Sequence, residues 1–423
     1  MSVVVEQVDP QNQAEQVLEA VPMRVSNRVN GADGFRAIAC LLVMCHHAFQ
    51  RLALPFIAPK FESALQYIFL RGEVGVSIFF VLSGCLLSMP FWSYRISGAP
   101  KPSIINYARN RITRIGPAFW FMMIISTFGG AWAFHTAVNW VHFWAGMTFT
   151  SEFYYKTLFP SDYNGVLWSI GNEVFCYVAM PILVLIIFKF TKSVKASGIA
   201  LIAWIGLLQA AQPFIIKHFM TGFAFKGWEY GLVGGAKIWM PYWNPICFLS
   251  QFMIGSAAAF LIVLQRKNHF MKGMYWDILC IVAGLSAFAL VLIRENPGNP
   301  DDWTHQPYVS PFYAILIAIA LASAASGVRM YKVLDNRLFR YIAKISFGLY
   351  LWHLFIATIM QNTIAKDFYP GGVGDTFRWL DDVLLAYGAA FIIASLSYRY
   401  FEKPILDWNH RQIQKRSAGR SID

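Results

Sequence analysis

Long apolar runs alternate with short polar stretches along almost the whole chain of 423 residues. A transmembrane helix needs ~20 consecutive apolar residues, and ten runs approach that length. The pattern therefore predicts an all-α, polytopic membrane helix bundle of about ten transmembrane helices. The ten runs cover residues 34–54, 72–94, 115–135, 165–188, 196–216, 244–265, 275–293, 311–327, 342–364 and 380–401. A shorter apolar stretch, 138–150, predicts an interfacial or re-entrant segment.

Basic side chains concentrate in every second loop between these runs, whereas the other loops carry more acidic and aromatic residues. Cytoplasmic loops of membrane proteins are enriched in Lys and Arg. We therefore expect a multi-pass membrane protein in which these loops and both termini are cytoplasmic. The basic residues are Arg95, Lys101, Arg109, Arg111, Arg114, Lys189, Lys192, Lys195, Arg266, Lys267, Lys272, Arg329, Lys332, Arg337, Arg340, Lys403, Arg411, Lys415, Arg416 and Arg420.

The composition agrees with a membrane protein, since 57% of residues are hydrophobic and only 14% are charged. Soluble domains have about 25% charged residues. The net charge of +12 is accounted for by the basic loops, which argues against a nucleic-acid partner. All six cysteines lie in apolar segments without a CxxC pair, so we expect neither a disulfide framework nor a metal site. The predicted organisation is a mostly disordered cytoplasmic tail (1–33), a membrane domain (34–408) and a basic cytoplasmic tail (409–423).

Arg36 and His47 are the most informative pair in the first apolar run. His47 follows Arg36 by eleven residues, just over three helical turns, so both lie on one face about 16 Å apart. Asp33 can pair with Arg36. His46 is next to His47 in the sequence but lies about 100° from it around the helix, so of the two histidines His47 shares the Arg36 face. Ionisable residues at membrane depth usually mark a functional site. The alternative is a histidine that only bonds to a neighbouring helix.

Two further segments place polar side chains inside predicted spans. In the first, the small residues Ser83 and Gly84 would admit a ligand, or serve only as a notch for helix packing. In the second, Ser169, Glu173 and Tyr177 share one helix face. Glu173 should face the bundle interior, where it would orient a histidine or pair with a structural arginine.

A fourth constellation and one basic cluster complete the candidates. Ser346, Tyr350 and His353 form another stripe, which would also fit an interfacial aromatic belt. Arg109, Arg111 and Arg114 precede Pro117 at the start of the third span. Guanidinium groups match phosphate geometry, although membrane topology alone would also place arginines there.

Taken in order, these segments resemble the acyltransferase family 3 of integral-membrane proteins. The matching stretches are Asp33 to Ala39 with His47, Phe79 to Gly84, Arg111 to Pro117, Leu167 to Ser169 with Glu173, Tyr177 and Pro181, Tyr350 to His353, and Phe401 to Pro404. One stretch departs from the family pattern Trp-Ser-Leu-Ser-Val-Glu-Glu-Gln-Phe-Tyr. The first glutamate of that pattern has become Asn172 here, or has shifted by one position to Glu173.

The resemblance implies a membrane O-acyltransferase that moves an acyl group, usually acetyl from cytoplasmic acetyl-CoA, to a hydroxyl of a cell-envelope or secreted carbohydrate. Acyl transfer needs a base to take the hydroxyl proton. An apolar site keeps an imidazole neutral, so His47 is the predicted base. Arg36 would help to hold the CoA end of the donor, and Glu173 completes the predicted catalytic residues. A covalent acyl-histidine relay is the alternative to direct transfer. Arg109, Arg111, Arg114 and Ser83 are the predicted donor-binding residues, with Ser83 or a backbone N–H beside Gly84 stabilising the oxyanion. The predicted acceptor-binding residues are Trp168, Ser169, Tyr177, Tyr350 and His353.

The implied partners are acyl-CoA, the carbohydrate acceptor, membrane lipids and glycan-assembly proteins, with no metal. Some family members carry a further extracytoplasmic esterase-like domain. Here the transfer is expected to be completed by the membrane domain or by a separate partner. Two other classes stay open: a proton-coupled transporter of a small carbohydrate or organic solute, which also places His and Glu at mid-membrane, and a structural or receptor protein. A transporter built from inverted repeats would show broken helices in matching halves, and none is evident.

Overall fold

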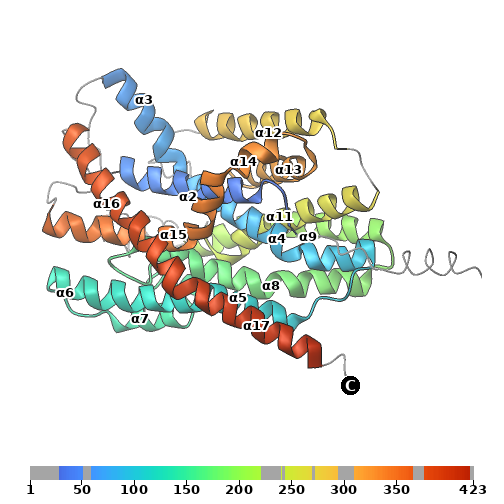
Figure 1. Ribbon diagram of the computed structural model, residues 1–423, viewed down its shortest axis with the longest axis horizontal. Coiled ribbons are helices and arrows are strands. Elements are labelled where there is room, and N and C mark those ends of the chain that lie inside the picture. The colour runs from blue at the N-terminus through green and yellow to red at the C-terminus, as the bar shows by residue number, and fades with distance from the viewer. Residues whose placement is uncertain are drawn as a thin grey trace, which may run out of the picture.

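The computed structural model describes residues 28–50, 59–220, 240, 243–268, 272–293, 309–364 and 376–419, and helices without strands make up its regular structure in these ranges (Figure 1). Each of the ten predicted spans corresponds to a helix. These helices are α2 (Ala32–Phe49), α4 (Gly75–Ser97), α5 (Ile104–Ile124), α8 (Trp168–Phe190), α9 (Val194–Met220), α11 (Pro245–Lys267), α12 (Met274–Ile293), α13 (Phe312–Ser326), α15 (Arg337–Thr363) and α16 (Thr376–Ser397).

Eight helical segments in the described ranges are long and apolar enough to cross a membrane. The two predicted spans outside this set are α13, which has 15 residues, and α2, which carries two charged residues and two histidines. A helix that buries ionisable groups among other helices need not be uniformly apolar, because those groups face protein instead of lipid. The protein is an integral, multi-pass membrane protein.

The shorter elements connect or extend these helices. They are α3 (Pro59–Phe69), η1 (Leu70–Val74), η2 (Ile125–Gly129), α6 (Gly130–Phe134), α7 (Trp140–Met147), η3 (Ser151–Phe153), η4 (Gly165–Leu167), α14 (Met330–Leu334), η7 (Tyr398–Glu402) and α17 (Lys403–Gly419). The apolar stretch at 138–150 forms α7, which exposes Trp140, Val141 and Trp144.

The structure describes only parts of the two predicted tails. Residues 1–27 lie outside the described residues, but the predicted tail already becomes helical at Ala32. At the other end, a turn of π-helix joins α16 to α17, so the segment predicted as a tail from residue 409 is helical through Gly419. Pro404 does not stop this helix: it follows the π-helical turn directly, and α16, the turn and α17 continue as one helical segment.

Helices α4 and α11 pack most closely, and glycines make the contact possible. A Cβ on Gly84 would collide with the carbonyl oxygen of Phe252, and one on Gly255 would collide with that of Val81. Gly84 is therefore a packing notch. Its backbone N–H lies in the middle of α4, where N–H groups bond within the helix.

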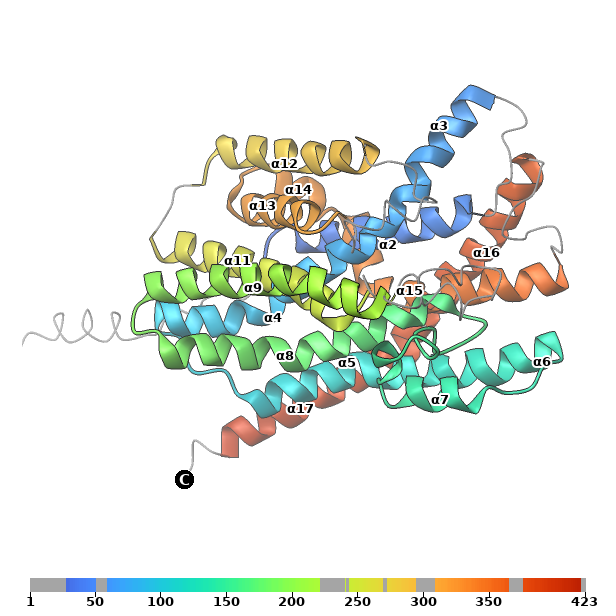
Figure 2. The same ribbon diagram turned by 180° about the vertical axis from the view of Figure 1, so that it is seen from behind.

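The loops that carry basic residues gather at one end of the bundle. Figure 2 shows the C-terminal ends of α4, α8, α11 and α17 there, whereas α6 and α7 lie at the opposite end. Lys101, Lys192 and Lys272 all belong to loops at the basic end. We call these the basic end and the α7 end of the bundle.

Candidate active site

Most of the predicted site residues line one cavity of about 100 Å³ inside the bundle, which we call the polar pocket. Side chains from α2, α4, α5, α8 and α15 converge there, although these helices lie far apart in the sequence. Its polar lining residues are Arg36, Ser83, Arg111, Arg114, Ser169, Glu173, Tyr177, Ser346 and Tyr350.

Glu173 is the centre of a hydroxyl network in this pocket. Its Oε1 accepts hydrogen bonds from Ser83 Oγ at 3.0 Å and from Tyr177 OH at 2.5 Å. Two such bonds stabilise a carboxylate at a depth where an unpaired charge would be costly. Ser83 therefore uses its side chain in the pocket, while the adjacent Gly84, about 100° around the helix, packs against α11.

Arg36 brings a positive charge into the same pocket from the first turns of α2. The anticipated partner, Asp33, forms an ion pair with Arg28 at 3.7 Å and also lies within electrostatic range of Arg36. Arg114, Tyr177 and Glu173 lie within electrostatic range of Arg36 as well. The charge of Arg36 therefore interacts with groups on both sides of the pocket.

The three arginines of α5 have different surroundings. Arg114 forms an ion pair with the buried Glu402 of η7 at 3.7 Å. In contrast, Nη1 of Arg109 and Nε of Arg111 are buried without a hydrogen-bond partner in the described part of the chain. Arg111 lines the polar pocket and lies 5.8 Å from the centre of the Tyr177 ring. Unpaired guanidinium N–H groups at the basic end are the donors that a phosphate or carboxylate would take up.

A second polar pair extends from the pocket towards α15. Ser169 Oγ and Tyr350 OH lie 2.7 Å apart, and the Tyr350 hydroxyl also donates to the carbonyl oxygen of Val166. One turn along α15, the His353 ring centre is 6.0 Å from that of Tyr350. Trp168 is placed elsewhere: it stacks on Trp243 in the core, with ring centres 4.7 Å apart.

His47 and His353 meet directly, although 306 residues separate them in the sequence. The His353 Nδ1–H donates to the carbonyl oxygen of Leu349 at 2.9 Å, since a carbonyl can only accept. A neutral His353 then offers the lone pair of Nε2, and the His47 Nδ1–H donates to it at 3.0 Å. This tautomer leaves the Nε2 of His47 as its basic nitrogen.

Helix α16 holds the end of α2 that carries His47. Tyr387 OH donates to the carbonyl oxygen of Met44 at 2.6 Å, and Trp379 Nε1 donates to that of Ala48 at 2.9 Å. His46 faces the other way, because its Nδ1 lies 2.6 Å from the carbonyl oxygen of Leu70. The two adjacent histidines therefore face different neighbours, as the helical angle between them predicted.

Glu152, in η3, is a buried ionisable residue that the sequence analysis did not select. It is 1% exposed, and its carboxylate lies so close to Gly171 that a Cβ there would collide with it. Burial raises the pKa of this carboxyl from 4.5 to about 7. The contact leaves no room for a side chain at position 171. The polar stretch around Glu152 resembles an ordinary loop, so its burial had no signal in the sequence.

Within the described residues, no three His, Cys, Asp or Glu side chains are grouped in a way that could hold a metal ion. The polar groups of the site are instead arginines, hydroxyls, one carboxylate and a histidine pair. This set can bind an anion, hold a carbonyl oxygen and move a proton.

The comparisons with known proteins agree with this chemistry. Residues 29–399 match the family described as an acyltransferase domain. The chain is 25% identical over 400 residues to the peptidoglycan O-acetyltransferase OatA of Listeria monocytogenes, covering 89% of this chain and 56% of that protein. It is 23% identical over 401 residues to O-acetyltransferase OatA of Staphylococcus aureus, with 89% and 57% covered. The chain thus spans little more than half the length of these relatives.

The family match covers every residue of the polar pocket as well as the His47–His353 pair. It does not favour the transporter hypothesis. The chain belongs to acyltransferase family 3 of integral-membrane proteins.

Proposed function

We propose that this protein is a membrane O-acetyltransferase that moves acetyl from acetyl-CoA to a hydroxyl of a cell-envelope carbohydrate. The observation that carries the proposal is the polar pocket: an arginine-lined cavity buried in a membrane bundle, with a hydroxyl–carboxylate network at its centre. The names of the two relatives support acetyl as the group transferred and a glycan as the acceptor.

The donor approaches from the basic end, which we propose is cytoplasmic. Arg109 and Arg111 bind its phosphates through their buried N–H groups, while Arg114 is held by Glu402 and completes the positive potential. Arg36 also lines the pocket, and its guanidinium adds to the positive potential that attracts the anionic donor. The thioester then reaches the level of Ser83 and Glu173, where the Ser83 O–H exchanges its Glu173 acceptor for the carbonyl oxygen of the thioester.

The proton of the acceptor hydroxyl is removed at the histidine pair, His47 and His353. The acceptor oxygen attacks the thioester carbonyl carbon, its proton passes to His47 Nε2, and the C–S bond breaks to release the CoA thiolate, which takes up a proton. His353 is a positioning residue, because it fixes the tautomer of His47. Ser169 and Tyr350 lie between the pocket and the histidine pair, where hydroxyls of a sugar would find hydrogen-bond partners.

Purified protein in detergent, supplied with radiolabelled acetyl-CoA and oligosaccharides from the cell envelope, tests the proposal. We expect acetyl ester on the glycan and free CoA in equal amounts, with both lost in His47→Ala. In cells, mass spectrometry of envelope glycans should show fewer O-acetyl groups without this protein. Unchanged glycan acetylation, together with no release of CoA by the purified protein, would reject the function.

A further inference from the structure

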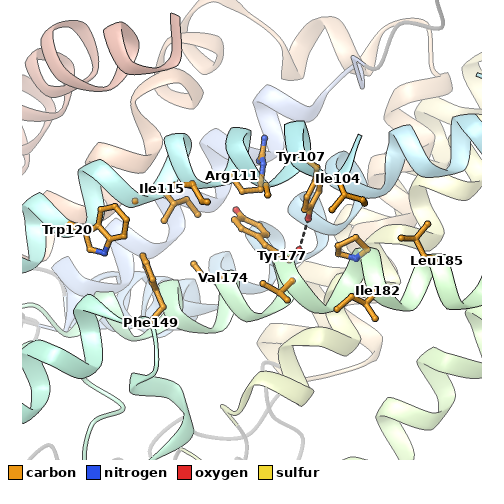
Figure 3. Close-up of a pocket in the computed structure, with 15 residues that line it drawn as sticks. Ile104, Tyr107, Arg111, Ile115, Trp120, Phe149, Val174, Tyr177, Ile182 and Leu185 are labelled. Carbon is orange, nitrogen blue, oxygen red and sulfur yellow. Dashed lines mark hydrogen bonds between the residues drawn. The ribbon is translucent and has the colours of Figure 1, made fainter. Parts of the chain in front are cut away.

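A second, larger cavity lies beside the polar pocket, in a groove between α5 and α8 (Figure 3). Its volume is about 360 Å³, and Arg111 is the only charged residue among those that line it. Ile112, Val178 and Ile182 on its rim are 58%, 61% and 53% exposed. Because both helices belong to membrane spans, this apolar groove opens towards the hydrocarbon of the bilayer.

The groove and the polar pocket share three lining residues, which form the wall between them: Arg111, Ile115 and Tyr177. Tyr177 is fixed on several sides. Its hydroxyl donates to Glu173, its carbonyl oxygen accepts from Tyr107 OH at 2.9 Å, and its ring lies 5.9 Å from that of Phe252. Ile115 is 4% exposed and fills the wall beside it.

The two volumes differ more than threefold, and the smaller one surrounds the groups assigned to the thioester. An acyl chain longer than acetyl would have to stay in about 100 Å³ or pass through the wall into the groove. A closely packed wall resists such an insertion, because added methylenes force side chains off their rotamers.

We infer that Ile115 and Tyr177 determine acyl-chain length: they close the reaction pocket against the groove and so restrict the donor to acetyl-sized groups. This inference rests on the proposed function, and it gives the apolar residue Ile115 a role in substrate specificity. In the wild type the wall keeps acyl chains out of the groove, and a longer chain would enter it only once the wall is opened.

The test compares kcat/KM for acetyl-CoA, butyryl-CoA and hexanoyl-CoA in wild type and in Ile115→Ala. Each methylene in an apolar pocket changes specificity by about 10- to 200-fold. We expect wild type to discriminate strongly against hexanoyl-CoA and Ile115→Ala to raise the hexanoyl-to-acetyl ratio by about tenfold or more. The ratio is measured within one sample, so a lower folded fraction does not affect it.

Ile182→Ala is the matched control, because it removes the same atoms from the groove rim and leaves the wall intact. Its ratio should equal that of wild type. The double variant Ile115→Ala/Val178→Trp refills the opened groove and should return the ratio towards the wild-type value.

Three results would overturn the inference while leaving the acetyltransferase function standing. Wild type using hexanoyl-CoA as well as acetyl-CoA would show that the wall does not select. An unchanged ratio in Ile115→Ala would show that Ile115 does not limit the chain, and an equal rise in Ile182→Ala would indicate a non-specific effect. In contrast, wild type with no acetyl transfer or CoA release at all would reject the proposed function itself.

Discussion

The hydrogen bond between His47 and His353 is the most testable contact in the site. His353→Ala removes the acceptor for the His47 Nδ1–H. The contact that holds the ring and the tautomer of His47 is then lost. His353→Gln keeps an acceptor, because its amide oxygen can occupy the place of Nε2. We expect the alanine variant to lower kcat and the glutamine variant to recover much of the loss.

The magnitudes separate the two histidines. A general base contributes about 10²- to 10⁴-fold, so His47→Ala should reduce kcat by that amount. Losing one hydrogen bond of about 0.5–1.5 kcal/mol corresponds to about a 2- to 13-fold decrease at about 1.36 kcal/mol per tenfold. His353→Ala should therefore fall between wild type and His47→Ala.

Initial rates of acetyl transfer at saturating acetyl-CoA measure these effects, normalised to the protein that elutes as a single peak in size-exclusion chromatography. His46→Ala is the control, since it lies on the same helix but faces the carbonyl oxygen of Leu70. Wild-type kcat in His353→Ala, or an equal loss from His46→Ala and His47→Ala, would refute the assignment of His47 as base.

Four further predictions concern the donor site, the reaction centre, the topology and the α7 end. Arg111→Ala should raise the acetyl-CoA KM by about tenfold or more, because it loses charge-assisted contacts of about 1.5–3 kcal/mol. Arg114→Ala should chiefly lower the melting temperature, because its carboxylate partner Glu402 stays buried without the ion pair. An unchanged KM in Arg111→Ala would mean that these arginines serve topology alone. Glu173→Gln should lower kcat by about tenfold with little change in melting temperature, since glutamine keeps the size and loses the charge, and normal turnover would remove this residue from the active site. A cysteine replacing Ile104 in a Cys-free background should resist a membrane-impermeant label added outside the cell, and labelling there would contradict a cytoplasmic basic end. Burial raises the pKa of Glu152 from 4.5 to about 7, so the free energy of unfolding of the wild type decreases as pH rises from about 4.5 through about 7. Glu152→Gln should remove up to about 3 kcal/mol of that decrease. If the melting temperature changes equally between pH 5 and pH 8 in both proteins, this reasoning is wrong.

The fold was largely predictable, because a bilayer imposes strong rules on sequence. Each span must be a helix of about twenty apolar residues. The ten apolar runs therefore matched ten helices, with errors at the ends. α3 and α17 were missed, since both are helices with ample polar character that the search for apolar runs passed over.

The site was predictable residue by residue but not contact by contact. Helical spacing placed Ser169, Glu173 and Tyr177 on one face, and all three line the polar pocket. The same spacing put Arg36 and His47 on one stripe, yet only Arg36 lines that pocket, while His47 meets His353 at the next helix. Spacing along one helix says which residues share a face, but it does not say which other helix that face meets.

The sequence by itself determined the helices, their alternation across the bilayer and the polar residues that a membrane interior tolerates only at a cost. Only the tertiary structure decided how those residues pair: Glu173 with Ser83, Arg114 with Glu402, and His47 with His353. It also decided that Gly84 serves packing and that Ile115 and Tyr177 stand between two cavities. The physical reason is range: helix formation and hydropathy are local properties of about twenty residues, whereas these contacts join helices through side-chain shape that close packing alone selects.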